Sequence, residues 1–264
     1  MSNKTALLTC PKHGPTRPLT GPGSKFFISY SEVVAFLVFV NEMATSIDKV
    51  IDILGTVPTD DPSKVKDKPT QLSTAELGAR AELRSHQQVF FQMLLCRFID
   101  NFVAYVSDLL AAVLKTKPEL LRSQETIKLD VLLKYKTMEE VVDHLAEEKV
   151  HELSYQGMRK ISEYIADRLG LDLFVDAVKL DAVVEWLEIR NLIVHNRGVV
   201  NRIFLSRLPN YKAKLGDTIS LDGKMIYGTS DVLSEVVQSL DERAAVKFGL
   251  PRSTAGPTEI PRTE

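Results

Sequence analysis

The sequence predicts a mostly α-helical protein built as a helical bundle. Apolar residues recur at helical spacing over several long segments. Two segments open with a capping-box pattern, Ser73–Glu76 and Thr137–Glu140, in which a hydroxyl and a carboxylate satisfy free amides reciprocally. Gly55, Gly170 and Gly198 follow the ends of three segments, where a glycine commonly stops a helix. Helices should therefore supply nearly all of the core.

The helices expected from these signals divide most of the chain. The first begins after Ser31, a good N-cap, and ends at Gly55, and the second is ended by Pro118. The only tryptophan, Trp186, supplies packing area in the fifth helix. The predicted helices cover residues 31–54, 73–114, 137–153, 157–170, 181–196 and 230–248.

One short segment near the carboxyl end has strand character. Residues 218–227 read as two β-prone runs around Asp222 and Gly223. Both residues tolerate positive φ, as a type I′ turn requires. We therefore expect one small β-hairpin at about 218–227.

Composition at the two ends separates them from the body of the chain. Residues 1–25 contain four prolines and three glycines among polar residues, which predicts a flexible lead-in. Residues 251–264 form a polar, proline-containing tail without periodicity. The remaining residues, 26–250, are expected to form a single helical domain whose central part spans about 80–210.

Bulk properties limit the classes of function. The 264 residues are 44% apolar, as in globular proteins, and the formal net charge of -2 gives no general attraction to polyanions. Two cysteines, Cys10 and Cys96, give neither a disulfide framework nor a Cys-x-x-Cys metal pair. The five histidines are scattered without the short helical spacing of metal ligands. We expect neither metal nor cofactor, with ligands from distant segments as the open alternative.

Apolar runs bear on the location of the protein. The run Ala6–Leu8 is too short for the core of a secretory signal. The run Val33–Val40 is the most apolar, but Asn41 and Glu42 end it before the roughly 18 residues that a membrane span needs. We expect this run to be a buried helix face in a cytoplasmic protein that does not enter a membrane.

The clearest local charge feature is a basic cluster that the slightly negative net charge of the whole chain conceals. Between positions 190 and 214 the chain has six cations and no acidic residue, namely Arg190, Arg197, Arg202, Arg207, Lys212 and Lys214. Such a cluster neutralises phosphates in a manner that is independent of sequence and sensitive to salt. The alternative is a solvated face that balances acidic residues elsewhere.

Within this cluster, Arg190, Asn191 and His195 have the chemistry for cleaving RNA. An imidazole exchanges a proton near neutral pH, and a guanidinium holds two phosphate oxygens. Asn191 and His195 share a helix face, whereas Arg190 lies about 140° from His195 on an ideal helix. All three act together only if the helix ends near His195, as Gly198 indicates, or if a second copy contributes. The alternative is that these cations offset the helix dipole.

The segment Glu188–Gly198 resembles the signature of HEPN-like domains. In that signature an arginine, usually followed by a polar residue, precedes a histidine by four to six intervening residues. Here four residues separate Arg190 from His195, and the polar residue is Asn191. Residues 126–155 also resemble a branch of the superfamily with predicted ribonuclease activity, and the likeness extends over roughly residues 80–210.

The resemblance implies a metal-independent endoribonuclease. Such domains are compact helical bundles that dimerise with two Arg-His helix ends facing one cleft, and their products carry a 2′,3′-cyclic phosphate and a 5′-hydroxyl. They occur in toxin-antitoxin and antiviral defence systems, so the expected partners are RNA, a second copy and an antitoxin or defence protein. The residues expected to contact RNA are Asn196, Arg197, Arg202 and Arg207. Arg97 and Asp100, on an earlier helix, are weaker candidates for the cleft, and the alternative for them is a structural ion pair or an exposed face.

Two other interpretations stay open. The resemblance also fits a non-catalytic helical module that dimerises or binds a partner protein. The basic cluster also fits an RNA-binding protein that leaves RNA whole, although binding alone requires no histidine at position 195.

Overall fold

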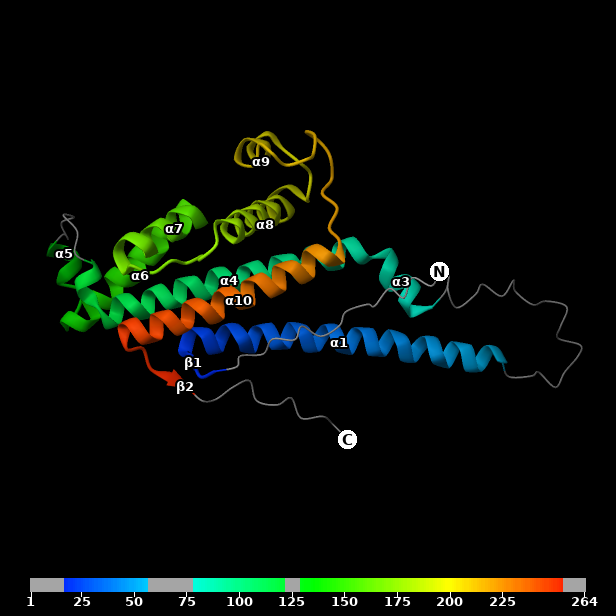
Figure 1. The fold of residues 1–264 in the computed structure, drawn as a ribbon, viewed down its shortest axis with the longest axis horizontal. Helices are drawn as coiled ribbons and strands as arrows, with labels where there is room; N and C mark the ends of the chain where they lie inside the picture. Colours follow the sequence, from blue (N-terminus) through cyan, green and yellow to red (C-terminus); the bar gives the residue numbers. More distant parts are fainter. Residues whose placement is uncertain (1–16, 57–77, 122–128, 254–264) are drawn as a thin grey trace, which may run out of the picture.

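The structure is a computed structural model and describes residues 17–56, 78–121 and 129–253, with side chains described up to position 50 in the first of these ranges. Two very short strands, β1 (Leu19–Thr20) and β2 (Arg252–Ser253), pair at one end of the molecule, and the rest is helical (Figure 1). In chain order the helical elements are α1 (Gly21–Thr56), α3 (Ala79–Ser85), α4 (Gln87–Thr116), the 3-10 turn η2 (Pro118–Leu121), α5 (Leu129–Leu132), α6 (Met138–Gln156), α7 (Met158–Tyr164), the π turn η3 (Ile165–Leu169), α8 (Ala177–Asn196), α9 (Arg202–Arg207) and α10 (Gly223–Phe248). The expected mostly helical class is confirmed.

The helices form three layers around α4. Figure 1 shows α1 on one side, α4 and α10 in the middle, and α6 to α9 on the other side. α4 packs against α1, α10, α6 and α8, and it buries twelve apolar or aromatic side chains, among them Leu95, Ile99 and Phe102. Buried residues from Leu19 to Leu250 belong to one hydrophobic cluster, so the core includes α1 and α10 as well as the region about 80–210.

β1 is fixed to α10 by a buried carboxylate. The Asp241 side chain accepts hydrogen bonds from the Thr20 backbone N–H, at 2.8 Å, and from the Thr20 hydroxyl. Gly23 allows this approach, because a Cβ atom there would lie 2.6 Å from Asp241 Oδ1. About two turns of α1 further on, the Tyr30 hydroxyl lies 2.6 Å from the Ser230 hydroxyl. β1 and the first turns of α1 are therefore part of the bundle.

This packing corrects the expected flexible lead-in at residues 1–25. α1 begins at Gly21, ten residues before the predicted start at Ser31, and Phe26 and Phe27 are 2% and 0% exposed. Pro22 was interpreted as a break, but a proline in the first helical turn removes an N–H that has no helical partner anyway. Residues 1–16 of the lead-in and 254–264 of the tail lie outside the described residues.

The hairpin expected at about 218–227 is not formed. Asp222 is instead the N-cap of α10, where its carboxylate accepts a hydrogen bond from the Met225 N–H at 2.7 Å. The preceding segment is extended, with Ile219 5% and Leu221 2% exposed, and Thr218 makes an isolated bridge to Val199. An aspartate before a helix satisfies free amides, so Asp222-Gly223 serves a helix start as well as it serves a turn. The last helix thus begins at Gly223, before the expected residue 230.

Two other predicted helix boundaries agree more closely with the structure. Thr137 caps α6 by accepting a hydrogen bond from the Glu140 N–H at 3.2 Å, and the Glu140 carboxylate accepts one from the Lys136 N–H. Thr137 is thus confirmed as the N-cap, while Glu140 bonds the amide of the residue before it instead of completing the predicted reciprocal box. Gly170, with φ 56°, ends the segment expected at 157–170, which divides into α7 and a π turn. The capping pattern at Ser73 lies outside the described residues.

The interpretation of Val33–Val40 as a buried face is only partly right. Leu37 is buried, but Phe36 and Phe39 are 55% and 58% exposed. By length and composition alone α1 and α4 would reach across a membrane, a test that the core helix of a water-soluble protein also passes.

Replacing Thr20 by valine should destabilise the protein by about 1.5–3 kcal/mol, because the buried Asp241 carboxylate loses a hydroxyl donor. Burial raises the pKa of Asp241 above 3.8, and the two Thr20 hydrogen bonds oppose that rise. The native state therefore loses stability as the pH rises from 3.8 through the raised pKa, and Thr20 limits that loss. In urea unfolding, Thr20→Val should lower the free energy of unfolding more at pH 7 than at pH 4. Thr20→Ser, which keeps the hydroxyl, is the control. An equal decrease in the free energy of unfolding at both pH values would contradict the role of the Thr20 hydroxyl as a donor to the Asp241 carboxylate.

Candidate functional site at the end of α8

α8 ends one residue after His195. The buried side chains Val183, Trp186, Ile189 and Leu192 fix this helix on the core. Arg197 caps the end in the left-handed conformation, with φ 55°, and the Gly198 N–H donates to the Leu192 carbonyl at 3.0 Å. This closing pattern leaves His195 in the last turn of the helix, as the position of Gly198 predicts.

Arg190 is held by two partners. Its Nη2 atom lies 2.7 Å from Asp100 Oδ1 on α4, and its Nη1 atom donates to Asn191 Oδ1 at 3.1 Å. The guanidinium side chain is only 27% exposed, and its Nε atom is buried without a hydrogen-bond partner among the described residues. The carboxylate of Asp100 thus fixes the direction of Arg190 and neutralises its charge.

Cys96 lies close to this ion pair, one helical turn before Asp100 on α4. Burial raises the pKa of the Cys96 thiol, the Asp100 carboxylate raises it further, and Arg190 opposes both effects. The thiol is therefore protonated at neutral pH and is a poor nucleophile. Cys96 contributes packing beside the pair.

His195 has a free imidazole. The residue is exposed, and its ring has neither a hydrogen bond nor an ion pair among the described residues. Asn191 lies one helical turn earlier on the same face of α8. The Arg190 guanidinium reaches Asn191 and Asp100. His195 lies one helical turn beyond Asn191, and among the described residues its ring contacts neither Asn191 nor Arg190.

The four residues expected to contact RNA fall into two pairs. The Asn196 amide donates to the Val199 carbonyl inside the turn after α8, and Arg207 lies 3.1 Å from the Glu188 carboxylate. Arg197 and Arg202 are exposed and have no acidic partner in the described part of the chain. Lys212 and Lys214 are exposed and likewise unpaired there. The free positive charge near the helix end thus comes from these four cations.

Of the weaker candidates, Asp100 is brought to the site and Arg97 is not. The Arg97 guanidinium donates to the Ser29 hydroxyl on α1 at 2.7 Å, on another side of α4. Asp100 and Arg190 are ninety positions apart in the sequence, and no local pattern indicates that they pair. The apolar spacing of α4 gave the only signal, since Asp100 interrupts it.

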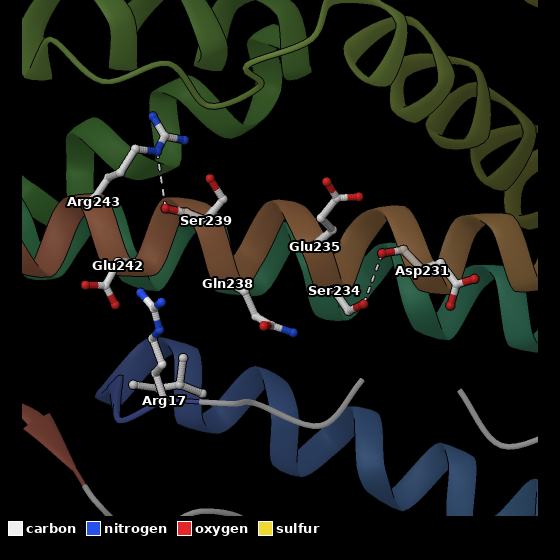
Figure 2. Close-up of a pocket in the computed structure, with 9 residues that line it drawn as sticks. Arg17, Asp231, Ser234, Glu235, Gln238, Ser239, Glu242 and Arg243 are labelled. Atoms are coloured by element: carbon white, nitrogen blue, oxygen red, sulfur yellow. Dashed lines mark hydrogen bonds between the residues drawn. The ribbon is translucent and has the colours of Figure 1, made fainter. Parts of the chain in front are cut away.

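A cavity in the described part of the structure lies away from this helix end. It has a volume of about 610 Å³ and is lined by Arg17, Leu19 and residues of α10 between Asp231 and Arg243 (Figure 2). Two of its carboxylates have partners within the chain, since Glu242 pairs with Arg252 and Glu235 with Lys179. It shares no residue with the end of α8. Nowhere in residues 17–50, 78–121 and 129–253 do three potential metal-binding side chains cluster.

Comparison of the chain with protein-family models, with curated proteins and with solved structures finds no match. The resemblance of residues 188–198 to HEPN-like domains therefore stays a prediction.

Proposed function

We propose that this chain is a metal-independent endoribonuclease of the HEPN-like type, acting on single-stranded RNA. One observation carries the proposal: a solvent-accessible imidazole, His195, stands in the last turn of a helix whose Arg190 is oriented by two partners. An orienting contact from a distant helix is more than a surface arginine needs. It is what a phosphate-binding group in a site requires.

In the proposed reaction the RNA supplies its own nucleophile. His195 takes the proton from a ribose 2′-hydroxyl, whose oxygen attacks the adjacent phosphorus, and the bond to the 5′-oxygen breaks as that oxygen receives a proton. Arg190 stabilises the charge that develops on the phosphoryl oxygens, and Asn191 orients the phosphate or the guanidinium. The products are a 2′,3′-cyclic phosphate and a 5′-hydroxyl. In a homodimer, His195 of the second copy is the natural donor of the second proton.

Asp100 acts as a positioning residue for Arg190. A guanidinium has five N–H donors, and only two of its nitrogens are engaged, one by Asp100 and one by Asn191. The Nε–H is buried, so the second N–H of each Nη atom would meet a phosphate, without any change in the direction of the side chain. Because Asp100 cancels the charge of Arg190, attraction of RNA depends on the unpaired cations, of which Arg197 and Arg202 lie nearest in sequence to the site.

The proposed biological setting is cytoplasmic, in a toxin-antitoxin or antiviral defence system, where a partner protein restrains the nuclease.

A second candidate function is RNA binding without cleavage. The four unpaired cations Arg197, Arg202, Lys212 and Lys214 favour it, since they would bind phosphates whether or not His195 reacts.

Substituting alanine for His195 should abolish cleavage of single-stranded RNA in excess EDTA, because no other group at the helix end moves the proton. The matched control is His151→Ala, which removes an exposed histidine of α6 whose ring contacts Tyr155. Cleavage is followed by gel electrophoresis, and circular dichroism establishes that each variant folds. Equal cleavage by wild type and His195→Ala would contradict the proposed role. RNA that is bound but left whole by wild type would favour the second candidate function.

Substituting asparagine for Asp100 should lower kcat by about a hundredfold, the usual cost of misplacing a catalytic group by about 1 Å. KM should change much less, since substrate capture depends on Arg197 and Arg202. The control is Asp108→Asn, a change on the same helix as Asp100. It breaks an exposed ion pair with Lys25 of α1. Unfolding by urea should distinguish a loss of position from a loss of fold. A variant as active as wild type would contradict the positioning role, and a more active variant would show that Asp100 restrains Arg190.

A further inference from the structure

α1 carries an exposed apolar stripe on its second half. Its members recur at intervals of three, four, four and three residues, and on an ideal helix they fall within an arc of about 80°. Large apolar side chains gathered on a surface mark an interaction site. The stripe consists of Phe36, Phe39, Met43, Ile47 and Val50, exposed by 55%, 58%, 46%, 42% and 54%.

The stripe is not the face that α1 uses within its own chain. That face is formed by Leu37, Ala44 and Asp48, which are 6%, 5% and 4% exposed. The Asp48 carboxylate pairs with Arg80 of α3 at 2.5 Å. Figure 1 shows that this half of α1 extends past the beginnings of α4 and α10, so its outer side has no neighbour in the described fold. An apolar face in that position gains free energy by being covered.

We propose that the stripe binds the same stripe of a second copy of this chain, with the two α1 helices antiparallel. Spacings of three and four residues form the seam of a two-helix coiled coil. Two exposed charges flank the seam on one side, Glu42 and Lys49, seven residues apart. Neither has an ion-pair partner among the side chains that the structure describes.

The order of these charges selects the orientation. In an antiparallel pair the flanking positions on this side face each other across the two-fold axis, so Glu42 of each copy lies opposite Lys49 of the other. The pairing therefore gives two ion pairs from one set of residues. In a parallel pair Glu42 faces the position of Ile47, and both charges stay unmatched.

The width of the stripe argues against a lipid surface. A helix that lies in a membrane interface buries a broad apolar face with cations on its polar side. Here the arc is narrow, and Glu32 lies on the same face one turn before Phe36. Glu42 and Ser46 are also exposed beside the stripe. Carboxylates at the edge of the seam favour a protein partner that supplies lysines.

The pairing is independent of the proposed ribonuclease site. α4 and α10 lie between α1 and α8 (Figure 1), so joining two α1 helices leaves His195 and Arg190 uncovered. Contact through α1 and contact through the end of α8 are therefore separable by substitution.

Substituting glutamate for Met43, at the centre of the stripe, should weaken self-association of the full chain at least a hundredfold, as measured by sedimentation equilibrium. The control is Val246→Glu, which changes a side chain of α10 that is 71% exposed. It should leave the mass unchanged. A wild-type protein that is monomeric, or whose mass Met43→Glu does not alter, overturns the proposal. Flotation of monomeric wild type with vesicles of anionic phospholipid would assign the stripe to a membrane surface instead.

A charge exchange tests the antiparallel orientation. Glu42→Lys or Lys49→Glu alone should weaken association about tenfold, because each turns both ion pairs into repulsions. An equal mixture of the two single variants should associate as tightly as wild type, since each copy then meets the opposite charge on the other. A mixture as weak as the separate variants overturns the antiparallel pairing.

Discussion

The fold depends on covering α4, whose buried side chains point in several directions around the helix axis. Such a helix is stable in water only when neighbours surround it, and α1, α10, α6 and α8 do so from different sides. A polar residue on α4 must then find a partner on the neighbour it faces. Asp100 faces α8 and pairs with Arg190. The direction of Arg190 is thus a consequence of how α8 packs on the central helix.

Local chemistry explains which elements were predictable from the sequence. Thr137 and Glu140 lie within one turn of the helix they cap, and Gly198 lies within one turn of the helix it ends. These signals act over a few residues and hold in the fold. Pro22 and Asp222 are also local signals, but each is compatible with two structures. A proline suits a loop or a first helical turn, and Asp-Gly suits a hairpin or a helix start, so only packing of Phe26 and Leu221 decides between them.

The candidate site shows the same division. Arg190, Asn191 and His195 were found as neighbours in sequence, and the helix end after His195 follows from Gly198. The pairing of Arg190 with Asp100 joins residues from different helices and could not be read from either segment. The sequence showed the cations of the basic cluster but not which of them are paired, since Glu188 neutralises Arg207 within the fold. Distant contacts decide which cations are free, and these leave Arg197 and Arg202 as the charges that we propose bind RNA.

The central claim is that RNA is cut by attack of its own 2′-hydroxyl at the end of α8. The most direct test compares an RNA oligonucleotide with the same oligonucleotide carrying one 2′-deoxy residue at the cleaved position, both incubated with wild type in excess EDTA. Only the first should be cut, and mass spectrometry should find a 2′,3′-cyclic phosphate on its product. Equal cutting of both, or of neither, would contradict the central claim.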